Sequence, residues 1–167
     1  VAVSKYLTKL AGDGVRIRIV GDRSAVSDKL RAAWDEAERL TAPNTRITLS
    51  VAFNYGGRWD VVQACRRIVE VGVPAGQIDE AMLSSHMAMS YAPDPDLFIR
   101  TGGEIRISNF MLWQTASSEL YFTHCLWPDF GEAELDAALA AYAQRDRRFG
   151  EVRDSLPALT AEARLGN

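Results

Sequence analysis

Two short runs rich in β-branched residues, at 15–20 and 47–53, constrain the fold of this chain more than any other feature. In the first run apolar residues alternate with arginine, a pattern typical of a strand, and Gly21 ends it. Between the runs, apolar residues recur at helical spacing from Val26 to Leu40, with charged residues on the opposite face. We therefore expect a strand, a helix and a second strand, in that order.

The same alternation continues along the chain. The patterns predict further helices at about 59–71, around Ile78 and Met82 and as far as Met89, at about 108–116 and at 132–144, and short strands at 97–99 and near 120–122. The strand at 97–99 is wholly apolar, as is typical of a strand buried on both faces. Such an order favours an α/β fold, a mostly parallel central sheet flanked by helices. We expect one domain over residues 1–150 and a loosely ordered tail over 151–167.

Charge and cysteine content exclude several function classes. The 19 Lys and Arg residues and 22 Asp and Glu residues give a net charge of −3, which is unlike the basic surface of a nucleic-acid binder. No apolar run reaches the roughly 18 residues that span a bilayer. Cys65 and Cys125 form no disulfide framework or metal-ligand motif. Both lie in apolar patterns, so we expect buried thiols and a cytoplasmic protein.

The loop at 100–109, which leaves the 97–99 strand, carries the strongest functional signal. Ligands of open parallel sheets bind at the carboxyl ends of strands. Arg100 and Arg106 supply guanidinium groups that suit phosphate oxygens, and Gly102 and Gly103 allow the backbone to bend and to approach a ligand. The combination favours a phosphate or diphosphate cradle.

A helix start strengthens this interpretation, since Ser108 or Asn109 is placed to cap the expected helix at 108–116 and helix N-termini favour anions. The alternative is a solvated turn in which the arginines pair with Glu104 and Asp96. We favour the cradle over this alternative.

Two other places remain open on the residues alone. The glycines of the loop at 54–59 either permit a tight turn or contact a ligand, and Arg58 either flanks a helix start or binds. Glu119 either ligates Mg²⁺ or pairs with an arginine. No G-x-x-x-x-G-K-[ST], G-x-G-x-x-G or G-x-S-x-G motif is present, so standard nucleotide loops and the hydrolase elbow find no support.

Taken together, these motifs resemble those of the cis-prenyltransferases, and in particular the bacterial undecaprenyl diphosphate synthases, or isoprenyl transferases. The resemblance runs from about Tyr6 to Gly150. The stretches that carry it are residues 14–22, 54–60, 96–114, 119–122, 126–130 and 147–150. The block at 96–114 is the most specific of them.

The resemblance implies a transferase that condenses isopentenyl diphosphate onto an allylic diphosphate such as farnesyl diphosphate. The product is a cis-polyprenyl diphosphate, such as the undecaprenyl carrier lipid of cell wall synthesis. By this likeness Arg100, Arg106 and Ser108 hold the isopentenyl diphosphate, and Glu119 is associated with Mg²⁺. Gly102 and Gly103 shape the same loop.

The resemblance also implies an assembly and a location. Arg148 and Gly150 match a motif that reaches the active site of the partner subunit in a homodimer. The enzyme is expected in the cytoplasm, with a peripheral contact at the inner face of the membrane for release of its lipid product. No nucleic acid is expected as a partner.

One departure stands out. The family's N-terminal segment, with its catalytic aspartate, its allylic diphosphate loop and part of a hydrophobic tunnel, has no counterpart in these residues. We therefore expect the fold to be incomplete at its N-terminal end and the 167 residues to be inactive by themselves. The strand at 47–53 is a candidate tunnel wall. Two other functions remain: a non-catalytic partner subunit of a prenyltransferase, and a generic binding module for phosphorylated small molecules.

Overall fold

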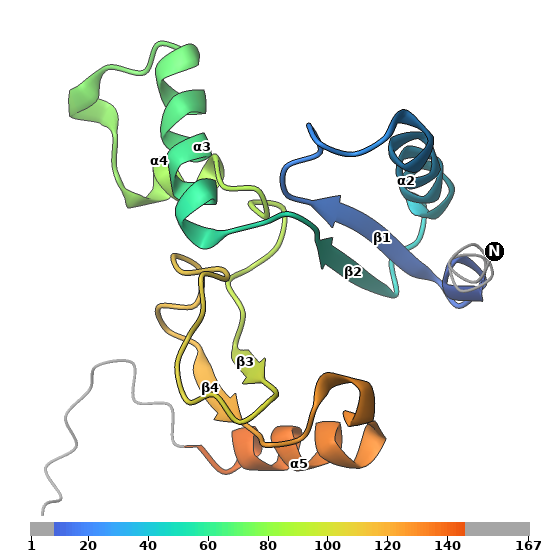
Figure 1. Cartoon of the computed structure of the whole chain (residues 1–167). Helices are drawn as coiled ribbons and strands as arrows, with labels where there is room; N and C mark the ends of the chain where they lie inside the picture. Colours follow the sequence, from blue (N-terminus) through green and yellow to red (C-terminus); the bar gives the residue numbers. More distant parts are fainter. Residues whose placement is uncertain (1–8, 146–167) are drawn as a thin grey trace, which may run out of the picture.

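The structure, a computed structural model, describes residues 9–145. Figure 1 shows the elements along the chain. They are β1 (Val15–Val20), α2 (Asp28–Thr41), β2 (Ile47–Ala52), α3 (Gly57–Glu70), η1 (Ala75–Gln77), α4 (Glu80–Ser85), β3 (Leu97–Arg100), β4 (Glu119–Phe122), η2 (Trp127–Asp129) and α5 (Glu132–Ala143).

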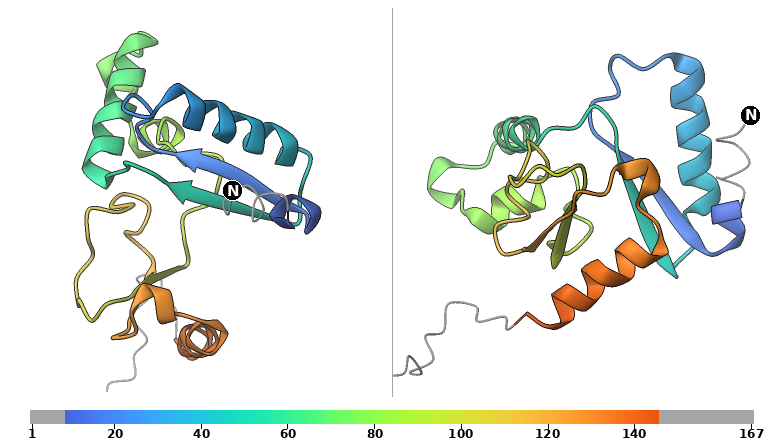
Figure 2. Two further views of the ribbon diagram at one scale, coloured as in Figure 1. Left: turned by 45° about the vertical axis from the view of Figure 1, so that its right-hand side comes forward. Right: turned by 60° about the horizontal axis from the view of Figure 1, so that its bottom comes forward.

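The strands pair in parallel, as the sequence predicts, but they form two separate sheets. β1 pairs with β2 from Val15 opposite Ile47 to Val20 opposite Ala52. β3 pairs with β4 over four residues in the same parallel sense. Figure 2 shows the two sheets apart in both views. The predicted α/β class is therefore confirmed, whereas a single sheet is not formed by the described residues.

Helix α2 closes the outer edge of β1. The Ile17 N–H donates to the Thr41 hydroxyl (2.9 Å) and the Ile19 N–H donates to the Glu38 carboxylate (2.6 Å), so these two backbone donors have side-chain partners in place of a strand. Thr41 is 1% exposed and in turn donates to the carbonyl of Ala37 (2.8 Å). This edge of β1 therefore does not accept a further strand at these positions.

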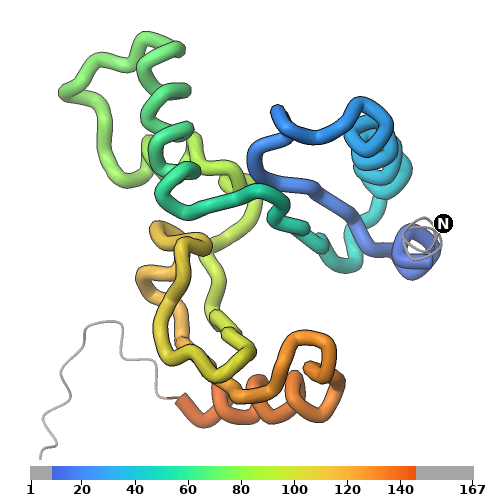
Figure 3. Tube along the Cα trace, viewed as in Figure 1, coloured from blue at the N-terminus to red at the C-terminus, as the bar shows by residue number. Residues whose placement is uncertain are grey.

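Tyr91 connects the first sheet to the segment that leads into β3. Its hydroxyl lies 2.8 Å from the Ser50 hydroxyl of β2, and the Arg18 guanidinium of β1 lies 4.0 Å from the centre of its ring. Beyond Tyr91 the chain runs from the α3–α4 pair toward β3, as the tube in Figure 3 shows. This side chain therefore joins the β1–β2 sheet to the segment that leads into β3.

Helix α3 differs from its predicted orientation. The sequence pattern places Cys65 and Ile68 inward, and the structure buries Ile68 but exposes Cys65. The buried stripe also includes Asp60, a carboxylate that a pattern built on apolar residues assigns to the outer face. Cys125 is half-buried, so the prediction of two buried thiols is wrong.

Two other expectations also need correction. Residues 108–116 form turns and no helix, because Met111 has a φ of 48°, which a right-handed helix excludes. In β3 only Phe98 is buried, so this strand is not covered on both faces by the described residues. Met89 follows α4 without belonging to it. Among the described residues, no helix is both long and apolar enough to cross a membrane.

Candidate functional site

The Gly102–Gly103 turn begins the loop that leaves β3. Both residues have positive φ, at 88° and 78°, as a glycine pair permits. Their N–H groups donate to the carbonyls of Cys125 and Thr123, each at 2.9 Å, and extend the β3–β4 pairing into the loop. A Cβ at Gly103 would also lie 2.9 Å from Nδ1 of His124. The predicted bend of the backbone at these glycines is observed, whereas their approach to a ligand stays a prediction, and the segment after β4 holds this end of the loop.

The structure brings the two predicted arginines together. The Arg100 guanidinium donates to the backbone carbonyl of Arg106, and the Arg106 guanidinium pairs with the Glu104 carboxylate. The Arg106–Glu104 pair is part of the alternative that the sequence left open. The Arg106 side chain is 67% exposed, and such pairs contribute little free energy because water screens them. The pairing thus leaves Arg106 available to a more highly charged anion.

Asn109 begins no helix of its own and instead contacts the N-terminus of α3. Its backbone carbonyl accepts from the Gly57 N–H, and its Oδ1 accepts from the Arg58 N–H, both at 3.0 Å. The N-cap residue of α3 is Gly56, which has no side chain to accept these bonds. A residue of the loop at 100–109, which we call the arginine loop, thus caps a helix that begins about 50 residues earlier in the chain. The helix-start argument for the cradle, which assigned Ser108 or Asn109 to a following helix, is therefore wrong.

The same contact explains the paired glycines of the other loop. A Cβ at Gly56 would lie 2.7 Å from the Asn109 side-chain nitrogen, and one at Gly57 would lie 2.8 Å from the backbone nitrogen of Leu112. Real Cβ atoms do not approach other atoms this closely. The two loops that the sequence presented as separate candidates are therefore packed against each other, and the glycines serve this packing.

Asp60 is a buried polar group beneath the contact between these two loops. It is 0% exposed and accepts from the Tyr55 hydroxyl (2.7 Å), the Ala88 N–H (2.8 Å) and the Gln114 side-chain amide (3.1 Å). Burial, and next the hydrogen bond to Asp60, raise the pKa of Tyr55, which keeps the phenol protonated as a donor. Sequence reasoning missed Asp60, because the apolar pattern assigns this carboxylate to the outer face of the predicted helix.

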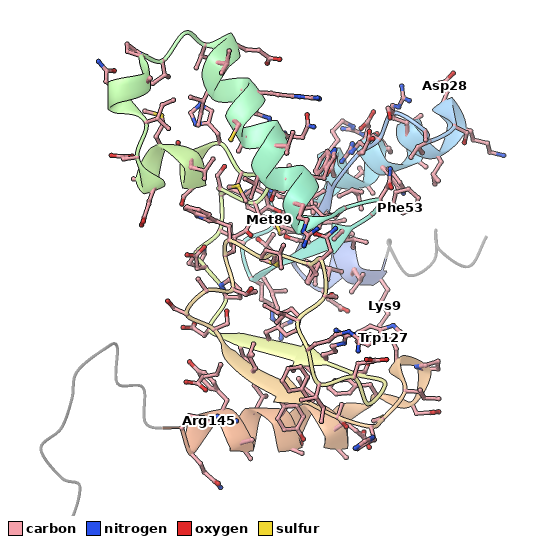
Figure 4. The ribbon with its side chains drawn as sticks, turned by 60° about the vertical axis from the view of Figure 1, so that its left-hand side comes forward. Lys9, Asp28, Phe53, Met89, Trp127 and Arg145 are labelled. Atoms are coloured by element: carbon pink, nitrogen blue, oxygen red, sulfur yellow. The ribbon has the colours of Figure 1, made fainter. Side chains whose placement is uncertain are left out.

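Glu119 does not lie beside Arg100 or Arg106. It is the first residue of β4 and pairs with Leu97, whereas Arg100 pairs with Phe122 three residues further along. That offset corresponds to about 10 Å along the strands. The Glu119 carboxylate lies 3.5 Å from the guanidinium of Arg145, and Figure 4 places Arg145 at the end of α5.

Residues 9–145 contain no group of three or more His, Cys, Asp or Glu side chains that could hold a metal. A Mg²⁺ ion held by one or two carboxylates together with phosphate oxygens and water does not need such a group. The arginine pairing that the sequence left open for Glu119 is the one observed.

Arg58 lies apart from the two arginines of the arginine loop. The Arg58 side chain, with Asp22 and Arg66, lines a pocket of about 550 Å³ along α3, which Arg100 and Arg106 do not line. Arg148 and Gly150 lie outside the described residues.

The candidate tunnel wall at 47–53 carries exposed apolar side chains, and its last residue packs against another aromatic ring. Ile47, Leu49, Val51 and Phe53 are all exposed. The Phe53 ring, labelled in Figure 4, lies beside Trp34 with 5.0 Å between the ring centres. The role of this strand as a tunnel wall stays a prediction.

A parallel α/β fold with two arginines in the loop after a strand places these residues where open parallel sheets commonly bind their ligands. The family model described as "Putative undecaprenyl diphosphate synthase" matches residues 1–150. The chain therefore belongs to this family, as the sequence resemblance predicts.

Several relatives agree. The isoprenyl transferase of Ralstonia nicotianae is 51% identical over 164 residues, covering 97% of this chain and 64% of the relative. The Escherichia coli K12 ditrans,polycis-undecaprenyl-diphosphate synthase, farnesyl-diphosphate specific, is 49% identical over 153 residues, covering 89% and 60%. The chain thus spans less than two thirds of the length of these relatives.

Solved structures show the same fold. A probable undecaprenyl diphosphate synthase from Campylobacter jejuni has a TM-score of 0.80 at 29% identity, covering 90% of this chain and 70% of that one. Lavandulyl diphosphate synthase from Lavandula x intermedia, in complex with dimethylallyl diphosphate, has a TM-score of 0.80 at 39% identity, covering 88% and 67%. The parallel strands flanked by helices are therefore those of this family.

The close packing of the 54–59 loop against the arginine loop gives a first prediction. Gly57→Ala should lower the free energy of unfolding by about 1–3 kcal/mol, because the added methyl meets the backbone at Leu112. Gly76→Ala is the matched control, since nothing lies within 4 Å of its Cβ position. Denaturant unfolding of both variants tests this, and equal stabilities would contradict the packing of the two loops.

Proposed function

We propose that this chain takes part in cis-prenyl chain elongation and binds isopentenyl diphosphate through Arg100 and Arg106. The observation that carries the proposal is the hydrogen bond from the Arg100 guanidinium to the backbone carbonyl of Arg106, which holds both arginines in the loop that leaves β3. The names of the relatives support it, since the Escherichia coli protein is specific for farnesyl diphosphate and the Lavandula protein was solved with dimethylallyl diphosphate.

The chemistry fits the arginines. In the proposed reaction, the carbon–oxygen bond of an allylic diphosphate breaks and diphosphate leaves. The double bond of isopentenyl diphosphate attacks the resulting carbon centre, and loss of a proton from the donor forms the new cis double bond. Arg100, Arg106 and Ser108 hold the donor diphosphate, which keeps its double bond near the reacting carbon. This orientation converts a bimolecular encounter into a reaction within one complex.

We propose Mg²⁺ as a cofactor with Glu119 supplying one oxygen. Mg²⁺ in phosphate-binding sites is commonly held by one or two carboxylates together with phosphate oxygens and water. Glu119 would supply one of these carboxylates.

We also propose that the protein forms a homodimer in which Arg148 and Gly150 reach the partner's site. We further propose a cytoplasmic enzyme that contacts the membrane peripherally to release its lipid product. Both proposals rest on the family resemblance.

The proposed function is tested by incorporation of labelled isopentenyl diphosphate, with farnesyl diphosphate and Mg²⁺ present. The assay compares this chain, the N-terminal portion of the Ralstonia nicotianae relative, and a fusion of that portion to Val1. We expect incorporation by the fusion alone. A folded fusion that binds isopentenyl diphosphate without incorporating it would favour a binding module or a non-catalytic subunit and would overturn the enzyme proposal.

Replacing either arginine should weaken donor binding. Arg100→Ala and Arg106→Ala should each raise the KM for isopentenyl diphosphate about tenfold or more and lower turnover in the fusion, because each removes a charge-assisted hydrogen bond. Arg39→Ala is the matched control, since Arg39 forms a comparable exposed pair with Glu36 on α2. Unchanged KM values in both test variants would count against these roles.

Glu119→Gln tests the proposed ion. The substitution removes a negative charge and one anionic oxygen, so we expect a several-fold higher Mg²⁺ concentration for half-maximal incorporation by the fusion. Glu36→Gln, on the exposed face of α2, controls for net charge. A Mg²⁺ titration that matches the unsubstituted fusion would remove Glu119 from the metal site.

A further inference from the structure

We infer that Asn109 is a positioning residue for the diphosphate: it anchors the arginine loop to the N-terminus of α3 and so sets the place of Ser108 and Arg106. The identity of the ligand rests on the proposed function above. The anchoring itself rests on the hydrogen bonds of Asn109 and on the close packing around it.

The first observation is that α3 depends on Asn109 for its cap. The first N–H groups of a helix have no partner within the helix. Here Asn109 accepts from two of them, Gly57 through its carbonyl and Arg58 through its side chain, while the N-cap Gly56 offers no side chain. Asparagine is among the preferred capping residues because its short side chain reaches these donors. In this structure the capping asparagine comes from a distant loop.

The second observation is that this contact leaves Asn109 little freedom. Gly56 approaches the Asn109 side chain more closely than any residue with a Cβ could, and Leu112 packs in the same way on Gly57. Five residues beyond Asn109, Gln114 donates to the buried Asp60 of α3. The stretch after the arginine loop is therefore held against α3 at several points.

The third observation is that the loop is held at both ends. At its beginning, Gly102 and Gly103 donate to the segment that follows β4, and at its end Asn109 binds α3. Between these anchors, Arg106 and Ser108 have exposed side chains. Ser108 is directly bonded to Asn109, so its Cα lies about 3.8 Å from an anchored residue. Losing the Asn109 anchor would release one end of this span, and a ligand would then have to order it on binding.

The capping bonds also bear on how the diphosphate is held. Because Asn109 occupies the Gly57 and Arg58 N–H groups, these two donors of α3 are not available to an anion. The negative charge is left to the guanidinium groups of Arg100 and Arg106. Asn109 therefore acts on the ligand through the loop and does not itself contact the diphosphate.

The test uses this chain with Asn109→Ala, Asn109→Asp and, as control, Asn44→Ala. Asn44 makes a similar bridge, since its side-chain amide donates to the carbonyls of Ala11 and Val15, each at 2.9 Å, beside β1. Removing it should disturb the fold as a lost bridging asparagine does, away from the arginine loop.

Three measurements are made on each variant. Hydrogen exchange follows the amides of Gly57 and Arg58, NMR relaxation follows the backbone mobility of residues 106–108, and calorimetry measures the Kd for isopentenyl diphosphate. For Asn109→Ala we expect faster exchange at Gly57 and Arg58, greater mobility at residues 106–108 and a Kd raised about tenfold. For Asn44→Ala we expect none of these changes. Asn109→Asp keeps the acceptor for Arg58, so its exchange should match the unsubstituted chain; this variant is read by exchange alone, because its charge repels the diphosphate.

The outcomes separate this inference from the proposed function. If the unsubstituted chain binds isopentenyl diphosphate and Asn109→Ala binds it equally tightly, the positioning role is overturned while the proposed function stands. Absence of binding by the unsubstituted chain overturns the proposed ligand. Unchanged backbone mobility at residues 106–108 in Asn109→Ala overturns the anchoring, whatever the ligand. If Asn109→Ala does not fold, faster exchange at Arg58 in the Asn109→Asp variant overturns it.

Discussion

The buried carboxylate of Asp60 is the interaction on which the candidate site depends. A carboxylate removed from water needs hydrogen-bond donors, and Asp60 draws them from three separate stretches of chain through Tyr55, Ala88 and Gln114. Loss of one donor would leave a buried charge partly unsatisfied, which costs far more than the bond itself contributes. The loop before α3, the segment after α4 and the turns after the arginine loop are thereby held together around one side chain.

The sequence predicts those parts of the fold that depend on local spacing, and it fails where distant residues decide. The strands around Ile17 and Phe98 and the helices α2, α3 and α5 lie close to their predicted places because their side-chain patterns are local. Residues 108–116 carry a helical pattern, but Asn109 is engaged by α3 and Met111 has a left-handed backbone conformation. Local spacing contains no information about the contact of Asn109 or the backbone conformation of Met111, so the expected helix could not be rejected from the sequence.

In the candidate site, too, the sequence predicts the local features and misses those that distant residues decide. Two arginines and a glycine pair in ten residues were sufficient to predict an anion cradle, and the structure brings Arg100 and Arg106 together. Their neighbours could not be predicted, because the partner of Asn109 comes from another element and the register of β3 on β4 separates Glu119 from Arg100. Residue types were thus visible in the sequence, whereas the distances among them depend on strand register and on packing between loops.

A net charge of −3 makes local control of the anion site necessary, since the protein as a whole does not attract a diphosphate. The attraction has to come from a few cations at short range, and Arg106 is held by an exposed pair with Glu104 that a diphosphate can outcompete. Short-range binding of this kind is sensitive to where the guanidinium groups lie, so it needs a loop whose ends are fixed. Hydrogen bonds from Gly102 and Gly103 fix one end, and Asn109 on α3 fixes the other. In the proposed function, backbone anchoring, and not overall charge, determines where the arginines meet the anion.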